Sequence, residues 1–178
     1  MKPSRLLTAL AALALSAASA GAMDVVTARG TVAVDGTPKT IAVYDAAAVD
    51  TLNRLGIHPA GLPDKLYVPA LEAARDGAAV IGTLFEPDLE ALSALAPDLV
   101  IVGARSAAKA DVTAKVAPTL DMTIDGDELL SEAKARLATY GELFGKAEEA
   151  KAIAGELDAK LAAARAAVAG QGKALIVM

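Results

Sequence analysis

The sequence predicts an α/β fold: a lobe built on a parallel, doubly wound sheet, with a β-hairpin before it and a long helix after it. Short apolar segments alternate with segments that carry apolar residues at helical spacing, and the connections between them are short. Leu99–Val102 is an unbroken apolar run, typical of a strand buried on both faces of a parallel sheet. The last periodic segment, residues 146–170, would span roughly 35 Å at ~1.5 Å per residue, about the width of a small domain.

The first half of the chain predicts the hairpin and the start of the sheet. Two β-rich runs within residues 24–38 flank Arg29-Gly30, which is the pattern of a hairpin. Residues 41–43 form a short apolar strand. Residues 46–55 place apolar side chains on one helical face, and Gly56 ends that helix.

The middle of the chain continues the alternation of strand and helix. Residues 57–62 predict a weak strand, residues 71–75 a helical turn and residues 79–82 another strand. Residues 88–95 then carry leucines on one helical face, and Pro97 ends this helix.

The remaining segments complete the sheet. After the strand at 99–102 we expect a helix at 107–116, a fifth strand at 119–122 and helices at 127–144 and 146–169. In terms of domains, residues 23–145 form an N-terminal α/β lobe and residues 146–170 a long linking helix. We interpret the apolar residues 171–178 as the first strand of a second lobe that is essentially missing. The alternative is that this strand pairs with an edge of the first sheet.

Residues 1–22 are predicted to be a cleavable secretory signal peptide. A positively charged start precedes the apolar segment 6–15, which is too short to span a bilayer. Ala18-Ser19-Ala20 matches a cleavage site, and Ala20-Gly21-Ala22 is a second candidate. No cysteine is present to carry a lipid, so we expect an exported protein without a membrane anchor.

Composition excludes several kinds of function. The formal net charge of the 178 residues is −5, and there is no basic stripe to neutralise phosphates, so we expect no nucleic-acid partner. The absence of cysteine excludes thiolate chemistry and cysteine metal sites within this sequence. His58 is the single histidine, best interpreted as a surface residue, so we predict no metal site and no cofactor. No phosphate-binding loop, nucleophile elbow or zinc-protease motif occurs, and we predict that the chain is not an enzyme.

Candidate binding residues fall in loops at the carboxyl ends of the predicted strands, where open α/β sheets bind ligands. Tyr44, Tyr67 and Phe85 lie in three of these loops, and aromatic rings gathered there would suit a flat, conjugated ligand. Arg105 follows the strand at 99–102, and its guanidinium is permanently charged with a fixed fork of donors for oxyanions. The alternative for each is an ordinary surface residue. Asp45 and Asp125 are predicted only as helix caps.

The segment E-P-D-L-E-A-L-S-A-L-A-P-D-L-V-I-V-G-A-R, residues 86–105, resembles the N-terminal lobe of the periplasmic binding proteins of iron-siderophore ABC importers. The resemblance runs from about Arg29 to the last residue and points to the branch that takes catecholate and mixed siderophores. It implies two α/β lobes joined by one long helix, with the second lobe largely missing here. It also implies capture of a ferric siderophore in the periplasm and delivery to an ABC permease of the inner membrane.

The resemblance also implies roles for individual residues. Arg105 matches an arginine that the catecholate branch places in the pocket, where it would face the negative charge of a ferric tris-catecholate. The other pocket arginines of that branch lie in the second lobe. Glu90 follows Pro87-Asp88-Leu89 and matches the glutamate that docks onto permease arginines, with Glu86 as the second candidate.

Three alternatives to siderophore capture stay open from the sequence. A binding protein of the same architecture could take heme or cobalamin instead. An exported α/β enzyme such as a hydrolase would need a nucleophile paired with a base, and His58 is poorly placed for that role. A chain with one lobe could also be a remnant that binds nothing.

Overall fold

The computed structural model describes residues 21–126 and 128–172. The predicted signal peptide, residues 1–22, and the predicted strand at 171–178 therefore lie almost entirely outside the described residues. Within the described part of the chain, no helix is long and apolar enough to cross a membrane.

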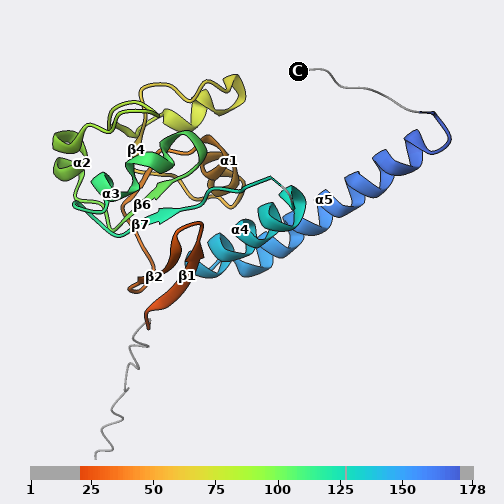
Figure 1. The fold of residues 1–178 in the computed structure, drawn as a ribbon, viewed down its shortest axis with the longest axis horizontal. Helices are drawn as coiled ribbons and strands as arrows, with labels where there is room; N and C mark the ends of the chain where they lie inside the picture. The colour runs from red at the N-terminus through yellow and green to blue at the C-terminus, as the bar shows by residue number, and fades with distance from the viewer. Residues whose placement is uncertain (1–20, 127, 173–178) are drawn as a thin grey trace, which may run out of the picture.

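The centre of the lobe is a parallel five-stranded sheet, as predicted (Figure 1). Its strands are β3 (Ile41–Val43), β4 (Gly61–Leu62), β5 (Ala79–Val80), β6 (Leu99–Val102) and β7 (Thr119–Asp121). Their order across the sheet is β5-β4-β3-β6-β7. The chain therefore adds strands outward from β3 in one direction and then returns to add β6 and β7 on the other side. The order reverses between β3 and β6, which is the topological switch point of a doubly wound sheet.

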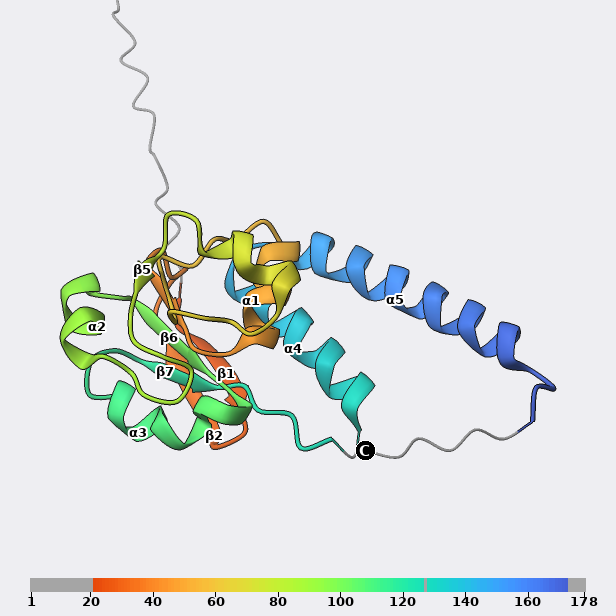
Figure 2. The ribbon, with the colours of Figure 1, turned by 90° about the horizontal axis from the view of Figure 1, so that it is seen from above.

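Two apolar clusters cover the two faces of the sheet. Alternate residues along a strand point to opposite faces, so Ile41 and Val43 join one cluster while Ala42 and Tyr44 join the other. The helices on the first face are α1 (Ala46–Arg54), α4 (Leu129–Leu143) and the first part of α5 (Ala147–Val168). Those on the second face are α2 (Leu89–Leu95) and α3 (Ala110–Thr113) (Figure 2). The sheet is thus buried on both sides.

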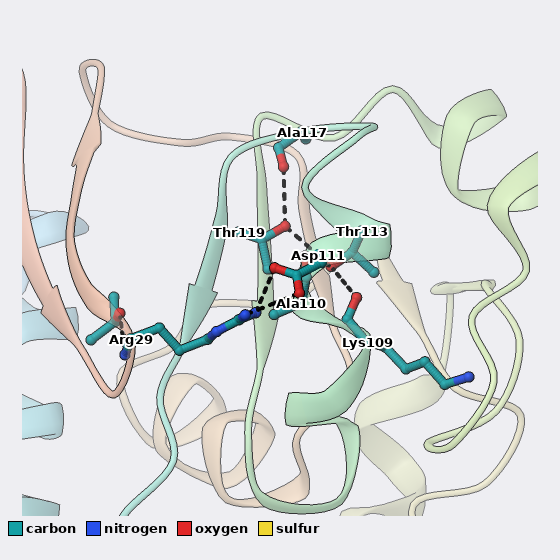
Figure 3. Close-up of polar contacts among 8 residues, drawn as sticks. Arg29, Lys109, Ala110, Asp111, Thr113, Ala117 and Thr119 are labelled. Carbon is teal, nitrogen blue, oxygen red and sulfur yellow. Dashed lines mark hydrogen bonds and ion pairs between the residues drawn. The ribbon is translucent and has the colours of Figure 1, made fainter.

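The predicted hairpin is confirmed as β1 (Met23–Thr27) and β2 (Gly30–Val34), which pair antiparallel. The amide of Ala28 in its turn donates a 2.9 Å hydrogen bond to the carbonyl of Asp121, at the end of β7. Arg29 adds a two-pronged ion pair with Asp111 of α3, with N–O distances of 2.9 and 3.0 Å (Figure 3). The hairpin is therefore fastened to the β7 side of the sheet.

Two predicted elements differ from the structure. The helix expected at 107–116 is instead a 3₁₀ helix, η2 (Ala104–Lys109), followed by the short α3. Ser106 explains the tight turn, because its amide donates to the carbonyl of Gly103 and its hydroxyl accepts from the amide of Gly103. The strand expected at 57–62 is reduced to β4, which is flanked by two prolines that lack the amide needed for sheet pairing. The expected helical turn at 71–75 lies within a second 3₁₀ helix, η1 (Pro69–Arg75).

The predicted long helix is confirmed as α5, and ion pairs hold its first half to the lobe. Lys134 of α4 pairs with Asp158, and Arg54 of α1 pairs with Glu156 at 3.1 Å. After Leu161 the residues of α5 are exposed, and this end of the helix projects beyond the sheet (Figures 1 and 2). Its role as a link between two lobes stays a prediction.

Candidate ligand-binding site

A concave surface of about 230 Å³ lies at the carboxyl ends of the strands, and we call it the switch-point pocket. Its walls come from the loops that follow β3, β4, β5 and β6. The residues that line it are Tyr44, Asp45, Ala46, Leu66, Tyr67, Val68, Leu84, Gly103, Ala104 and Arg105. The pocket therefore sits where the order of strands reverses, the position at which open α/β sheets bind ligands.

Arg105 and Tyr67, both predicted from the sequence, meet in this pocket with their side chains accessible. The side chain of Tyr67 is 59% exposed. Within the described residues, the guanidinium of Arg105 makes no hydrogen bond or ion pair that would neutralise it. An arginine without a partner beside an exposed aromatic ring can receive an anionic group on an aromatic or chelated ligand.

The backbone of the pocket is strained at two points. Tyr67 has a φ of 59° and Ala104 a φ of 45°, the left-handed region that residues with a Cβ rarely adopt. Each such conformation costs on the order of 1–3 kcal/mol and persists only where the surroundings enforce it. Both residues line the same pocket, whereas Ala96, with a φ of 48°, lies outside it as the C-cap of α2.

Tyr44 follows β3 as predicted and lines the pocket, but its side chain does so from inside the core. Its side chain is completely buried, and its hydroxyl donates a 2.7 Å hydrogen bond to the carbonyl of Ile81. Burial raises the pKa of Tyr44, and the negative charge of Asp88 raises it further. The hydroxyl therefore stays protonated and hydrogen-bonded to Ile81. It is not available to a ligand, to which Tyr44 offers only the pocket wall.

Phe85 lies beside the pocket without lining it. Its neighbour Leu84 is part of the wall, whereas Phe85 itself is 48% exposed on the turn after β5. The hydroxyl of Thr83 accepts hydrogen bonds from the amides of Phe85 and Glu86, at 3.2 and 2.9 Å, and these fix the turn. Phe85 is thus presented on a rigid turn at the margin of the site.

The structure separates the two glutamates considered for docking. Glu86 forms an ion pair with Lys109 at 2.7 Å. Glu90 lies in the first turn of α2, exposed, and within the described residues its carboxylate has no ion pair or hydrogen bond. Of the two, Glu90 is the carboxylate available to an outside partner. It does not line the switch-point pocket.

Sequence reasoning missed two residues that shape the pocket. Ser106 is buried, and its hydroxyl donates to the carbonyl of Tyr44 at 3.0 Å, which ties the loop after β6 to the loop after β3. Asp45 caps α1 as predicted, accepting from the amide of Ala48, but it also lines the pocket. Asp45 lies just after the first strand of the parallel sheet, at its carboxyl end, and this position in the sequence could have indicated its second role.

The remaining polar residues considered in the sequence, His58 and Asp125, do not line the switch-point pocket. His58 is exposed, in agreement with its interpretation as a surface residue. Among the described residues, no cluster of three histidine, aspartate or glutamate side chains could hold a metal ion. Asp125 does not cap α4, because that helix begins after Glu128.

Comparison with known proteins agrees with this architecture. The chain is similar to the petrobactin-binding protein YclQ of Bacillus subtilis, with 32% identity over 128 residues that cover 70% of this chain and 40% of YclQ. The crystal structure of YclQ matches with a TM-score of 0.81 at 28% identity, covering 85% of this chain and 55% of that structure.

Two further proteins show the same pattern. The Fe(3+) dicitrate-binding periplasmic protein FecB of Escherichia coli is 31% identical over 147 residues, covering 80% of this chain and 49% of FecB. The siderophore-binding protein BauB, solved with two molecules of acinetobactin and ferric iron, matches with a TM-score of 0.78 at 28% identity. That match covers 84% of this chain and 55% of BauB.

The chain spans about half the length of these relatives. A family model described as periplasmic binding protein matches residues 41–178, from the first strand of the parallel sheet to the end of the chain. The sheet order, the pocket and this match together establish that the chain belongs to the periplasmic binding protein family.

Proposed function

We propose that this chain takes part in the capture of a ferric siderophore outside the cytoplasm and in its delivery to an ABC permease. The observation that carries the proposal is Arg105, which lies at the topological switch point of the sheet and has no hydrogen-bond or ion-pair partner among the described residues. A chelated ferric complex with anionic oxygens would be met there by a permanent positive charge and by the exposed ring of Tyr67.

The names of the relatives support an iron complex as the ligand. YclQ is described as binding petrobactin, FecB as binding ferric dicitrate and BauB as holding acinetobactin with ferric iron. These names favour a ferric complex over heme or cobalamin. The family consists of binding proteins, which favours binding over catalysis.

Delivery and location complete the proposal. The carboxylate of Glu90 on α2, which has no partner in the part of the chain that the structure describes, is suited to dock onto arginines of the permease. The signal-peptide pattern in residues 1–22 would bring the mature chain to the periplasm. We propose that residues 146–170 link the lobe to a second one that completes the site.

The size of the pocket predicts weak binding by this chain alone. Ligand pockets occupy about 300–1,000 Å³ and bury most of the ligand surface. The switch-point pocket measures about 230 Å³, so it would enclose only part of a ferric siderophore. We expect measurable but weak affinity from the lobe.

Titration tests the proposal directly. The purified chain is titrated with ferric siderophores while amide signal intensities are followed by NMR, since high-spin ferric iron broadens the signals of nearby amides. Broadening should concentrate at the pocket, and Arg105→Ala should weaken binding about tenfold or more, as expected for loss of a charged hydrogen-bond donor. Arg165→Ala is the matched control, since Arg165 is exposed near the far end of α5. Broadening spread evenly over the surface, or equal effects of the two substitutions, would contradict the proposal.

A further inference from the structure

The switch-point pocket carries a negative charge as well as a positive one. Asp45 and Arg105 are the charged members of its lining. Among the described residues, neither forms an ion pair, so the two charges do not neutralise each other by direct contact. The pocket therefore presents two separate opposite charges and almost no net charge to a ligand.

The carboxylate of Asp45 is held in place from two sides. The amide of Ala48 donates a 3.1 Å hydrogen bond to its Oδ2, as the cap of α1. On the other side, Gly103 approaches so closely that a Cβ added there would lie 3.0 Å from the Cγ of Asp45. The absence of a side chain at Gly103 makes room for this carboxylate, and the cap prevents it from turning away.

The carboxylate of Asp45 is only partly exposed to water. Burial is the main influence on this carboxyl and raises its pKa, Asp121 acts in the same direction, and the amides of Ala48 and Ala47 oppose both. A charge that water screens poorly acts more strongly on a neighbouring ligand than one in bulk solvent.

These observations allow an inference about the class of ligand, and this inference rests on the proposed function of siderophore capture. A ferric tris-catecholate carries three negative charges, so Arg105 would attract it while Asp45 repels it. A ferric complex of low net charge would be little affected by Asp45. We propose that Asp45 is a specificity residue that disfavours strongly anionic ferric complexes, so that the preferred ligands are ferric complexes of low net charge. This differs from the tris-catecholate that the resemblance alone implies.

Two probes and two variants test the proposal. The probes are a ferric tris-catecholate with three negative charges and a neutral ferric tris-hydroxamate. Asp45→Asn removes the charge but keeps an oxygen that can cap α1, because asparagine caps helices as well as aspartate. Asp50→Asn is the matched control: it removes the same charge from an exposed position one turn later on α1, outside the pocket lining.

The measurement is the dissociation constant of each probe, obtained by NMR titration at low and high salt. Asp45→Asn should strengthen binding of the tris-catecholate about tenfold and change binding of the hydroxamate less than about twofold. Added salt should reduce the difference, and Asp50→Asn should change neither constant appreciably.

The contrary outcomes separate the two proposals. If the chain binds ferric complexes but Asp45→Asn leaves the ratio of the two constants unchanged, or acts no more strongly than Asp50→Asn, the role of Asp45 is overturned while siderophore capture stands. If neither probe broadens the amide signals of the pocket in the wild-type chain, both proposals fail.

Discussion

The hydroxyl of Tyr44 lies 2.7 Å from the carbonyl oxygen of Ile81, and this hydrogen bond crosses the sheet beneath the candidate site. Tyr44 follows β3 and Ile81 follows β5, with β4 between these two strands. The contact therefore fixes the distance between the loop after β3 and the loop after β5, which both border the pocket. No atom of the intervening strand β4 takes part in this hydrogen bond.

Tyr44→Phe should lower the free energy of unfolding by about 1 kcal/mol, the net value of one hydrogen bond. The effect stays modest because the carbonyl of Ile81 also accepts from the amide of Asp88. Chemical denaturation measures the change. Tyr67→Phe is the control, because Tyr67 is exposed and should lose no stability. Equal stability of wild type and Tyr44→Phe would contradict the assigned role.

Gly82→Ala should destabilise the chain by more than about 2 kcal/mol, as overpacking against fixed backbone does. Gly82 has a φ of 108°, and an added Cβ would lie 2.5 Å from both the amide nitrogen of Asp88 and the carbonyl oxygen of Glu86. Gly77→Ala measures the cost of the backbone conformation alone, since Gly77 has a φ of 83° and a Cβ added there would meet no atom within 4 Å. That control should cost only about 1–2 kcal/mol. Equal melting temperatures of the two variants would show that the close contacts do not matter.

Asp98 should contribute a pH-dependent part of the stability. Its carboxylate accepts from the amides of Lys39 and Thr40, at 2.9 and 2.8 Å, and these bonds lower the pKa of Asp98 in the folded chain. The stabilisation is therefore present above the unfolded pKa of about 3.9 and disappears as the pH falls through the lower folded value.

Thermal unfolding at several pH values tests this for Asp98→Asn. Wild type should be the more stable protein near neutral pH, and the difference between the two melting temperatures should shrink as the pH falls below about 3.9 and through the lower folded pKa of Asp98. Asp76→Asn serves as the control at an exposed position. If the difference in melting temperature between wild type and Asp98→Asn is the same at every pH, the charge of Asp98 is not its cause.

Glu90→Arg should impair uptake of the ferric complex while leaving its binding unchanged, because Glu90 does not line the pocket. Uptake of radioactive iron by cells that depend on this protein measures the effect. Glu86→Arg is the comparison: it breaks the ion pair with Lys109 and should affect uptake less. Normal uptake with Glu90→Arg would remove the docking role.

The sequence predicted those elements that local patterns determine. The alternation of apolar runs located β3 and β6, and the leucines within residues 88–95 located α2. The long helix α5 was equally clear, since its apolar residues recur over six turns. These features depend on neighbours in the chain, so a single sequence suffices to predict them.

The sequence did not predict features that depend on tertiary contacts. Tyr44 was predicted in the loop after the first strand, where it lies, but its burial in the cluster with Ile81 and Val100 was not predicted. Asp45 was predicted only as a helix cap. Its place in the pocket depends on the close approach of Gly103, which lies far from it in sequence. The left-handed φ of Tyr67 also has no local signal.

The hydrogen bond from Ala28 to Asp121 has a consequence for the behaviour of the chain in solution. An edge strand with free amides and carbonyls can template the addition of another chain and so begin aggregation. At the β7 edge the turn of the hairpin is hydrogen-bonded to the end of the strand, and at the opposite edge β5 is only two residues long. Within the described residues, neither edge of the parallel sheet offers a long free pairing surface, which disfavours edge-to-edge assembly of the folded lobe.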